Sequence, residues 1–552
     1  MDTRERFSTH VVENQPPALA PYDAWATDLP LREALAREGG GWAETEVAAY
    51  GALAGGEMME WGRLANEHRP RLHSFDRQGR RIDQVEFHPA YHQLMAAAVA
   101  HGVPNFAWRH AGRPGAHVAR AALMFLHNQA DAGTSCPLTM TYACVPALRH
   151  QPELAEAWLP RVFDGRYDPR HVPAWEKPGN TLGMGMTEKQ GGSDVRSNST
   201  RATPVAAPGP GRLYELVGHK WFFSAPMCDG FLVLAQAAGG LSCFLLPRFT
   251  PDGGLNAVRI QRLKDKLGDW SNASSEVEFH GAVAWLLGEE GRGVATILQM
   301  VALTRLDCLL GSASLQRQAL VQALHHARHR RAFGKALSAQ PLMRNVLADL
   351  ALESEAATAL AFRVARAVDA GERGDAGEAA FARLTTALGK YWVCKRTPAF
   401  VAEAMECLGG VGYVEETGLP RLYRQAPLNS IWEGSGNIQC LDVLRALARE
   451  PACAAAFFAE LEAARGGHPA LDAEAAALRE RLREPADALE AQARHLAERM
   501  ALALQASLLL RSAPAAVAEA FCEARLRGVG GLAFGTLPPG GAWELLLERA
   551  LP

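Results

Sequence analysis

Residues 183–200 read GMGMTEKQGGSDVRSNST, a stretch dense in glycine and in small hydroxyl residues. Glycines let the backbone approach a ligand closely. Thr187, Ser193 and the surrounding backbone N–H groups can donate hydrogen bonds to a heteroaromatic edge or to a phosphate. The competing interpretation is a polar linker between domains, which the composition alone favours.

The hydrophobic pattern of the chain changes at this stretch. Before it, from about residue 30 to 160, apolar residues recur at helical spacing between Pro and Gly breaks. After it come short runs rich in β-branched and aromatic residues, such as LYELVGHKWFFSA, FLVLAQAA and SSEVEFHGAVAWLLG. Helical spacing returns after Gly293, and the chain beyond Pro451 is rich in Ala, Leu, Arg and Glu. These changes predict a mainly α chain with a central β domain.

We expect five segments along the chain. They are an N-terminal arm (1–29), an N-terminal helical domain (30–183), a central β domain (184–296), a C-terminal helical bundle (297–447) and an extra helical domain (448–552).

Bulk properties exclude several classes of protein. The formal net charge of −3 gives no global field that would attract nucleic acid or an anionic membrane. The ten cysteines include no CxxC pair, which disfavours a disulfide framework and a zinc module. The N-terminus is charged where a signal peptide needs an apolar run, and we expect no membrane span and a cytoplasmic protein. His325 and His329 show a helical HxxxH spacing, but neighbouring arginines disfavour a metal, and none is predicted.

The stretch VGHKWFFS (217–224) places two large rings on consecutive strand residues, Phe222 and Phe223. Consecutive strand residues point to opposite faces, so one ring can pack in a core while the other meets a flat ligand. Core packing for both rings is the alternative interpretation.

An isolated acid stands in the stretch NSIWEGSGNIQCL (429–441), where Glu433 follows Trp432 and precedes a GSGN turn. Ser435 or Asn437 is a favoured N-cap for the helix that follows. Partial burial raises the pKa of such an acid, whereas the helix dipole opposes the rise. A carboxylate in this setting can act as a base toward an acidified C–H bond. The alternative role is simple capping of the helix.

Five motifs in this order resemble the acyl-CoA dehydrogenase superfamily. They are MTEKQGGSD (186–194), GHKWFFS (218–224), RRAFGKALSAQ (330–340), LGGVGY (408–413) and IWEGSGN (431–437). The resemblance implies a helical domain, a β-barrel domain and a four-helix-bundle domain with FAD as cofactor. The family chemistry would have Glu433 remove the α-proton of an acyl-CoA while the flavin accepts the β-hydride.

The resemblance also assigns residues to the cofactor. Thr187 would lie near the isoalloxazine and Ser193 at the pyrophosphate, while Arg330, Phe333 and Gln340 would reach the FAD of a neighbouring subunit. The remaining residues expected to line FAD are Met184, Gly185, Met186, Gly192, Phe222, Phe223, Ser224, Gly409, Gly410, Gly434, Ser435, Gly436 and Asn437. The family's other position for the base falls on Thr304, which cannot serve, so the choice rests on Glu433.

Departures at Lys189, Glu406 and Gln425, with LKDKLGDWSNAS and the N-terminal FSTHVVENQPPAL, resemble the AidB-like branch, flavoproteins tied to the response to DNA alkylation. This resemblance implies an extra C-terminal helical domain, a homotetramer, double-stranded DNA as a partner and weak or residual isovaleryl-type acyl-CoA dehydrogenase activity. The alternatives are a conventional catabolic short- or branched-chain acyl-CoA dehydrogenase and a flavin-dependent oxygen-using enzyme.

The residues themselves give DNA binding little support. From Pro451 onward there are ten Arg, no Lys and thirteen acids, so this segment carries a charge of −3. Arg479 and Arg483 share a helix face with Arg494 adjoining, and this stripe is the candidate DNA contact. Pairing with nearby acids on a solvated face is the competing interpretation.

Overall fold

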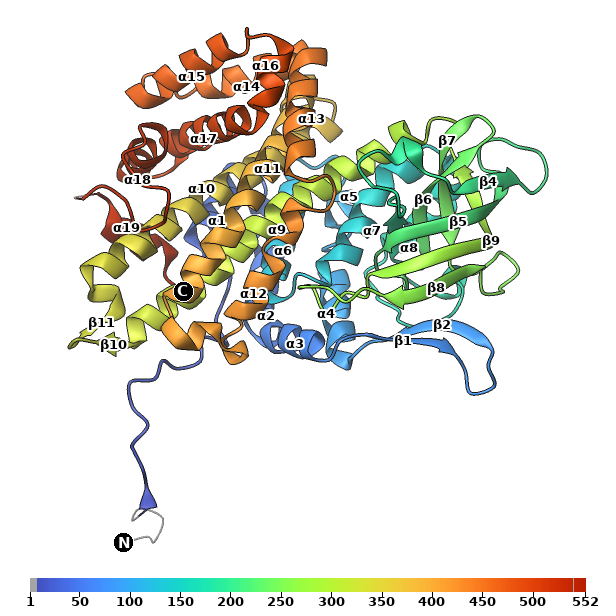
Figure 1. Cartoon of the computed structure of the whole chain (residues 1–552), viewed down its shortest axis with the longest axis horizontal. Helices are drawn as coiled ribbons and strands as arrows, with labels where there is room; N and C mark the ends of the chain where they lie inside the picture. The colour runs from blue at the N-terminus through green and yellow to red at the C-terminus, as the bar shows by residue number, and fades with distance from the viewer. Residues whose placement is uncertain (1–6, 540) are drawn as a thin grey trace.

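A computed structural model describes residues 7–539 and 541–552. The β domain occupies one end of the molecule and helices fill the rest (Figure 1). Helices precede the β domain along the chain, form the bundle at the centre, and continue beyond it to the C-terminus.

The N-terminal region is helical, with one β-hairpin inserted. Its elements are α1 (Leu29–Arg37), α2 (Glu44–Gly55), α3 (Glu57–Glu67), β1 (Arg71–Phe75), β2 (Arg81–Glu86), α4 (Pro89–Ala100), α5 (Phe106–Arg109), α6 (Ala116–Ala130), α7 (Ser135–Leu148) and α8 (Pro152–Val162). The sequence predicted helices alone here, and the hairpin is a correction. Its strands are half exposed and carry mostly polar residues, so they lack the apolar alternation that reveals a strand.

The β domain forms a sheet that closes on itself. Its strands are β3 (Leu182–Gly185), β4 (Arg201–Pro204), β5 (Leu213–Phe223), β6 (Gly230–Ala237), β7 (Gly240–Pro247), β8 (Val258–Leu263) and β9 (Ser275–Leu287). The strand order is β3-β6-β4-β5-β9-β7, and β6 also pairs with β7, which completes the ring. Closure removes most of the exposed sheet edge. Helices α7 and α8 share the apolar core of this domain.

The central bundle is built around one long buried helix. Its elements are α9 (Gly293–His329), the short strands β10 (Arg331–Ala332) and β11 (Lys335–Ala336), and the helices α10 (Pro341–Glu372), α11 (Ala376–Glu406), α12 (Leu419–Gln425) and α13 (Gly436–Arg449). Helix α9 packs against α6, α7, α10 and α11. It therefore links the N-terminal helices to the bundle.

One expectation about α9 needs correction. The sequence was expected to hold no segment long and apolar enough to cross a bilayer, yet α9 meets this test by length and composition, with a mean hydropathy of 1.5 over its most apolar window. Two thirds of that window is buried inside the molecule. Its apolar surface is used in the core, as in the central helix of a soluble protein.

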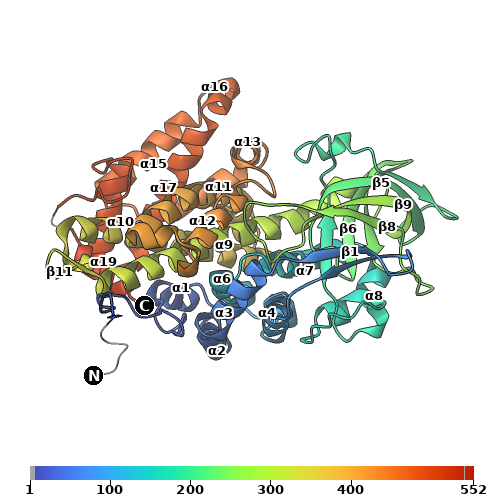
Figure 2. The ribbon, with the colours of Figure 1, turned by 60° about the horizontal axis from the view of Figure 1, so that its bottom comes forward.

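In the described residues the bundle is followed by the α-helices α14 (Pro451–Glu462), α15 (Pro469–Arg481), α16 (Ala486–Ala491), α17 (Ala493–Ser512), α18 (Ala515–Phe521) and α19 (Trp543–Ala550), with a π-helical turn at Cys522–Leu526. Helices α14 and α15 begin at a proline, whose fixed φ and missing N–H suit the first helical position. Helix α17 packs on α10, α11 and α13, and α19 packs on α10 and α1. In Figure 2 these C-terminal helices lie against the bundle at the end away from the β domain. The five-segment division stays a prediction.

Candidate active site

The candidate site is a cavity of about 560 Å³ between the β domain and the bundle. Its walls come from α6, α7, the loop after β3, the end of β5, the segment Lys266–Ser274, α9 and the loop before α13. Met184, Met186, Ile297 and Trp432 make much of the lining apolar, and Glu433 lines the same space. The cavity thus joins the glycine-rich stretch to the isolated acid.

Glu433 stands on a constrained backbone. Its φ is +57°, a left-handed conformation that side chains rarely adopt. Three side chains hold the loop in place. Lys390 Nζ donates to the carbonyls of Trp432 at 2.9 Å and of Gly434 at 2.8 Å, and Arg305 Nε donates to the carbonyl of Glu433 at 3.0 Å. Gln439 Nε2 donates to the carbonyl of Gly434 at 2.9 Å. These bonds stabilise an orientation that the local sequence disfavours.

Thr304 and Glu433 are brought together by the fold. The Thr304 hydroxyl, on α9, donates to Glu433 Oε2 at 2.7 Å. Helix α9 therefore places a hydrogen-bond donor at the position where the resemblance offered a rival base. The loop N-terminal to α13 supplies the acid, with Ser435 as N-cap but without a side-chain capping bond. The alternative role, in which Glu433 helps to cap the helix, has no capping hydrogen bond from its carboxylate in the described residues.

Burial raises the pKa of Glu433 above its ordinary value. The Thr304 hydrogen bond and the positive charges of Lys390 and Arg305 oppose that rise. A carboxylate with a raised pKa is a stronger base once it is ionised. The geometry and the electrostatics both suit proton abstraction within the cavity.

We expect the rate of proton abstraction to fall as the pH drops through the raised pKa of Glu433, since only the ionised carboxylate can accept a proton. Thr304→Val removes a bond that lowers this pKa, so the acid limb of the kcat–pH profile should move to higher pH. The profile is measured with saturating substrate in wild type and variant. A limb that moves to lower pH, or stays in place, would contradict this account.

The glycine-rich loop lies at the cavity, as the sequence indicated. Met184, Met186, Thr187, Gly192 and Ser193 all line it. The packing in this loop is tight, because a Cβ at position 192 would meet Thr187 Oγ1 at 2.4 Å.

Gly185 faces another way and lies buried in β3. A Cβ there would meet the Phe223 ring at 2.5 Å, so glycine is needed for strand packing. Its predicted place at the cofactor is not supported by the cavity lining.

The loop carries a buried ion pair that the sequence did not reveal. Lys220 Nζ, on β5, donates to Glu188 Oε1 and to the carbonyl of Leu234, each at 2.8 Å. Glu188 also accepts from the backbone N–H groups of Ser199 and Thr200. Both charged side chains are fully buried. Counting the Ser199 hydroxyl and the Gln190 amide, the carboxylate accepts five hydrogen bonds from described residues, and the bond from Lys220 fastens the loop to β5.

Three family descriptions match the chain. They are the adaptive response protein AidB N-terminal domain over residues 14–169, the acyl-CoA dehydrogenase middle domain over 183–282 and the acyl-CoA dehydrogenase C-terminal domain over 291–448. The putative acyl-CoA dehydrogenase AidB of Escherichia coli is 49% identical over 528 residues, which cover 95% of this chain and 96% of that protein. The chain belongs to the AidB branch of the acyl-CoA dehydrogenase superfamily.

Other similar proteins agree with this membership of the acyl-CoA dehydrogenase superfamily. Acyl-CoA dehydrogenase family member 11 of Caenorhabditis elegans is 33% identical over 72% of this chain and 66% of that protein. The solved structure of ACDH-11 from Caenorhabditis elegans, in complex with C11-CoA, has a TM-score of 0.85 at 28% identity and covers 95% of both chains. The Bd2924 apo-form has a TM-score of 0.83 at 29% identity, covering 92% of this chain and all of that one. The predicted fold class is confirmed.

Membership of the superfamily makes the chain an FAD-dependent, acyl-CoA dehydrogenase-like oxidoreductase. The cavity fits a flavin. Asp269 Oδ1, Asn272 Oδ1 and Gln425 Nε2 are buried without a hydrogen-bond partner among the described residues, and all three residues line the cavity. The polar edge of a flavin carries the N–H and carbonyl groups that such atoms need.

Asp269, Asn272 and Gln425 were not among the predicted site residues of this acyl-CoA dehydrogenase. Burial raises the pKa of Asp269 to about 7, with nearby Asp131 adding to the rise and Lys266 opposing it. Asp269 and Asn272 both belong to the stretch LKDKLGDWSNAS (263–274), whereas Gln425 lies outside it. The sequence does not show that the polar side chains of this stretch line the cavity, because that depends on how the chain folds.

The aromatic pair divides as alternation on a strand requires. Phe222 is half exposed and lines the cavity together with Ser224. Phe223 is fully buried and packs on Phe231 with ring centroids 4.4 Å apart. The prediction that the Phe223 ring borders the flavin is therefore corrected, because its side of β5 faces the β-domain core.

The remaining predicted cofactor residues divide between the cavity and the surface. Gly434 and Ser435 line the cavity, whereas Gly436 is buried at the start of α13. Gly409 and Gly410 are exposed on the surface, and Asn437 is exposed while its Oδ1 accepts from Arg494 Nε at 2.8 Å. In a single chain these three residues do not reach the cavity.

The acyl-CoA dehydrogenase motif RRAFGKALSAQ also lies away from the cavity. Phe333 is 98% exposed with a φ of +51°, Gln340 Nε2 donates to the carbonyl of Ala332, and Arg330 Nη1 donates to the carbonyl of Asn14. The resemblance assigned this motif to a neighbouring subunit's FAD, and that assignment stays a prediction.

Proposed function

We propose that this chain is an AidB-like flavoprotein that dehydrogenates acyl-CoA thioesters, with Glu433 as the base. The observation that carries the proposal is the Glu433 carboxylate, fixed by Thr304 inside a cavity shared by the glycine-rich loop. FAD, when bound, would supply the acceptor for the β-hydride. Glu433 would take the α-proton, and the apolar lining from Met184, Met186 and Ile297 would exclude water.

The acyl chain is the part of the substrate that the apolar lining would bind. The AidB resemblance favours a short branched, isovaleryl-type chain with weak turnover. The C11-CoA complex of the Caenorhabditis elegans protein favours a longer one. We retain both as candidate substrates of the same site.

We further propose that the protein acts in the response to DNA alkylation, in the cytoplasm, as a homotetramer that binds double-stranded DNA. The support is 49% identity to the Escherichia coli AidB protein along nearly the whole chain. The candidate DNA contacts in the C-terminal helices have local partners. Arg479 pairs with Glu462 at 3.3 Å and Arg483 pairs with Glu480 at 2.7 Å. Such exposed pairs are weak and would yield to phosphates.

Both parts of the proposal are tested on one preparation of the FAD-loaded full chain. We expect anaerobic addition of isovaleryl-CoA or undecanoyl-CoA to bleach the flavin, and duplex DNA to bind with an affinity that falls as salt rises. If neither thioester bleaches the flavin, the dehydrogenase proposal is excluded.

The DNA part has its own variants. Replacing Arg479 and Arg483 together by Ala should reduce the slope of log affinity against log salt by about 2, since each phosphate contact contributes about one. Arg465→Ala is the matched control, because Arg465 is an exposed arginine in the turn between α14 and α15 and pairs with Glu462 at 2.7 Å. Equal slopes in all three proteins would exclude the arginine stripe as the contact.

A further inference from the structure

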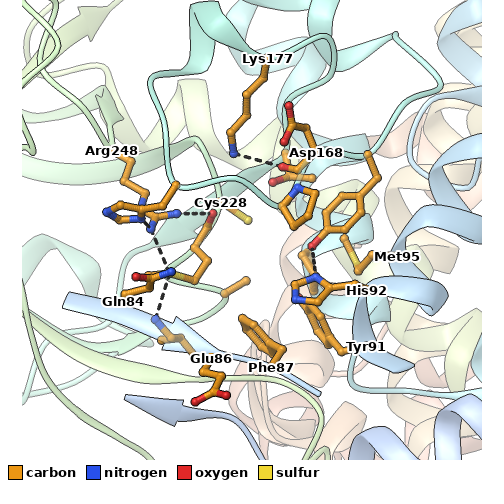
Figure 3. A pocket seen from close by; sticks show the side chains of 18 of the residues that line it. Gln84, Glu86, Phe87, Tyr91, His92, Met95, Asp168, Lys177, Cys228 and Arg248 are labelled. Atoms are coloured by element: carbon orange, nitrogen blue, oxygen red, sulfur yellow. Dashed lines mark hydrogen bonds between the residues drawn. The ribbon is translucent and has the colours of Figure 1, made fainter. Parts of the chain in front are cut away.

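A second cavity of about 320 Å³ lies beside the active site and is used by none of the chemistry above. It is lined by the β1–β2 hairpin, α4, the segment after α8 and the connections at the ends of β-domain strands, including the β5–β6 loop and Arg248 just after β7 (Figure 3). The polar lining includes Arg248, Lys177, Tyr167 and His92. Its surroundings are thus built from two domains, which is a common place for small-molecule sites.

Arg248 is a buried cation without a counter-charge. Arg248 is 8% exposed and forms no ion pair with any described residue. Nη1 donates to the carbonyl of Met227 at 2.8 Å, and Nη2 contacts His171 Nδ1. Burial lowers the pKa of the guanidinium to about 9. Buried charges in proteins are normally paired, so an uncompensated arginine facing a cavity indicates an anionic ligand.

The second cation of the cavity is already neutralised. Lys177 Nζ lies 2.7 Å from Asp229 Oδ1 and also donates to the carbonyl of Asp168. The Asp168 carboxylate is in turn paired with Arg170 at 2.6 Å. Among the described lining residues Arg248 is therefore a cation that no carboxylate contacts. The Glu86 carboxylate, 2.8 Å from His73 Nε2 on the same lining, would repel a second negative charge, so the cavity suits a monoanion better than a phosphate dianion.

The opposite wall of the cavity is apolar and aromatic. Phe87 and Tyr91 stack with ring centroids 3.9 Å apart at an interplanar angle of 14°, and Met95 lies beside them (Figure 3). The Tyr167 hydroxyl and His92 Nδ1 lie 3.0 Å apart at its edge. A ligand that satisfies both walls has one carboxylate and a small flat or apolar body.

Only a thin wall separates this cavity from the active site. Pro137 lines the second cavity while its neighbour Cys136 lines the first, and Ala225 lines the second while Ser224 lines the first. Ala225 has a φ of +51°, so this stretch of wall is strained. A ligand that displaces Ala225 would also displace its neighbour Ser224, which lines the flavin site.

We propose that this cavity binds a small amphiphilic monocarboxylate, with its carboxylate on Arg248 and its body against Phe87 and Tyr91. The probe with the closest chemistry is benzoate, which carries one carboxylate on a flat apolar ring. Octanoate tests whether an aliphatic body is accepted as well. Inorganic phosphate tests whether the site takes any anion.

The test is calorimetric titration of the FAD-loaded full chain with sodium benzoate, octanoate and phosphate, repeated while the flavin absorbance is followed. We expect one benzoate per chain, a small shift of the flavin spectrum, and weak or undetectable phosphate binding. Arg248→Met should weaken benzoate binding about 10- to 100-fold, as loss of a charged hydrogen-bond partner does.

Arg259→Met is the matched control, because Arg259 is an exposed arginine on β8 of the same domain. It should leave the affinity unchanged. If Arg248→Met yields no folded holoprotein, Arg248→Lys keeps the charge and should weaken binding several-fold, because an ammonium group lacks the planar set of N–H donors of a guanidinium. The proposal is overturned if neither carboxylate binds at millimolar concentration, if phosphate binds more tightly than benzoate, or if the folded Arg248 variant binds benzoate like wild type.

Discussion

Glu433→Gln is expected to lower acyl-CoA dehydrogenation about 10²- to 10⁴-fold, the contribution typical of a positioned general base. Glutamine keeps the shape of the side chain and can still accept the Thr304 hydrogen bond. The backbone bonds from Lys390 and Arg305 go to carbonyls of the loop and do not depend on the carboxylate. The cavity should therefore keep its form and its FAD while losing the proton acceptor.

The measurement is single-turnover flavin reduction under anaerobic conditions, with FAD content determined on the same sample. Glu406→Gln is the matched control, since Glu406 is an exposed acid at the end of α11 and lies outside the cavity. Turnover by Glu433→Gln within a few-fold of wild type would show that another group removes the proton. Loss of FAD from the variant would instead show that the Glu433 carboxylate is needed to maintain the shape of the cofactor site.

Lys220→Met is expected to have the second largest effect, because it leaves the Glu188 carboxylate buried without its cation. Breaking such a pair costs about 3–5 kcal/mol. Although burial raises it, Lys220 and the Thr200 and Ser199 hydrogen bonds hold the pKa of Glu188 well below its ordinary value. The loop that contains Glu188 also carries Thr187 and Ser193 at the cavity, so FAD affinity should fall together with thermal stability.

A double-variant cycle separates the charge from the packing. Adding Glu188→Leu to Lys220→Met removes both charges and should recover much of the lost stability, since apolar replacement of a whole buried pair is often close to neutral. Lys189→Met, an exposed neighbour in the same loop, should change neither the melting temperature nor FAD binding by much. No recovery in the double variant would mean that the pair acts through specific hydrogen bonds.

Much of the architecture was predictable because it leaves local signals. The helical period of α9 and the short apolar runs of the β domain are repeated patterns within single segments. The β1–β2 hairpin left no such signal, and the strands were missed. The sequence analysis expected no helix long and apolar enough to span a membrane, and α9 is one. Length and apolarity alone do not separate a buried core helix from a membrane span.

The candidate site was predictable only in part. The motif around Glu433 and the loop around Thr187 could be recognised from composition and order, and both reach one cavity. The sequence could not decide which of Phe222 and Phe223 faces that cavity. Alternation along a strand shows that the two rings lie on opposite faces, but not which face meets the cavity. It also gave Asp269 no role, since a buried polar atom is recognised only by its surroundings.

Sequence alone determined the family, the order of helical and β regions, and the identity of the isolated acid, since these depend on residues near one another along the chain. Tertiary structure decided what surrounds that acid. Thr304 lies 129 residues before Glu433 and Lys220 lies 32 residues after Glu188, yet each pair is joined by a hydrogen bond. Long-range contacts depend on how helices and strands pack, and spacing in the sequence does not record which faces meet. For the same reason, the sequence could not show that Arg248 lies at a cavity without a counter-charge.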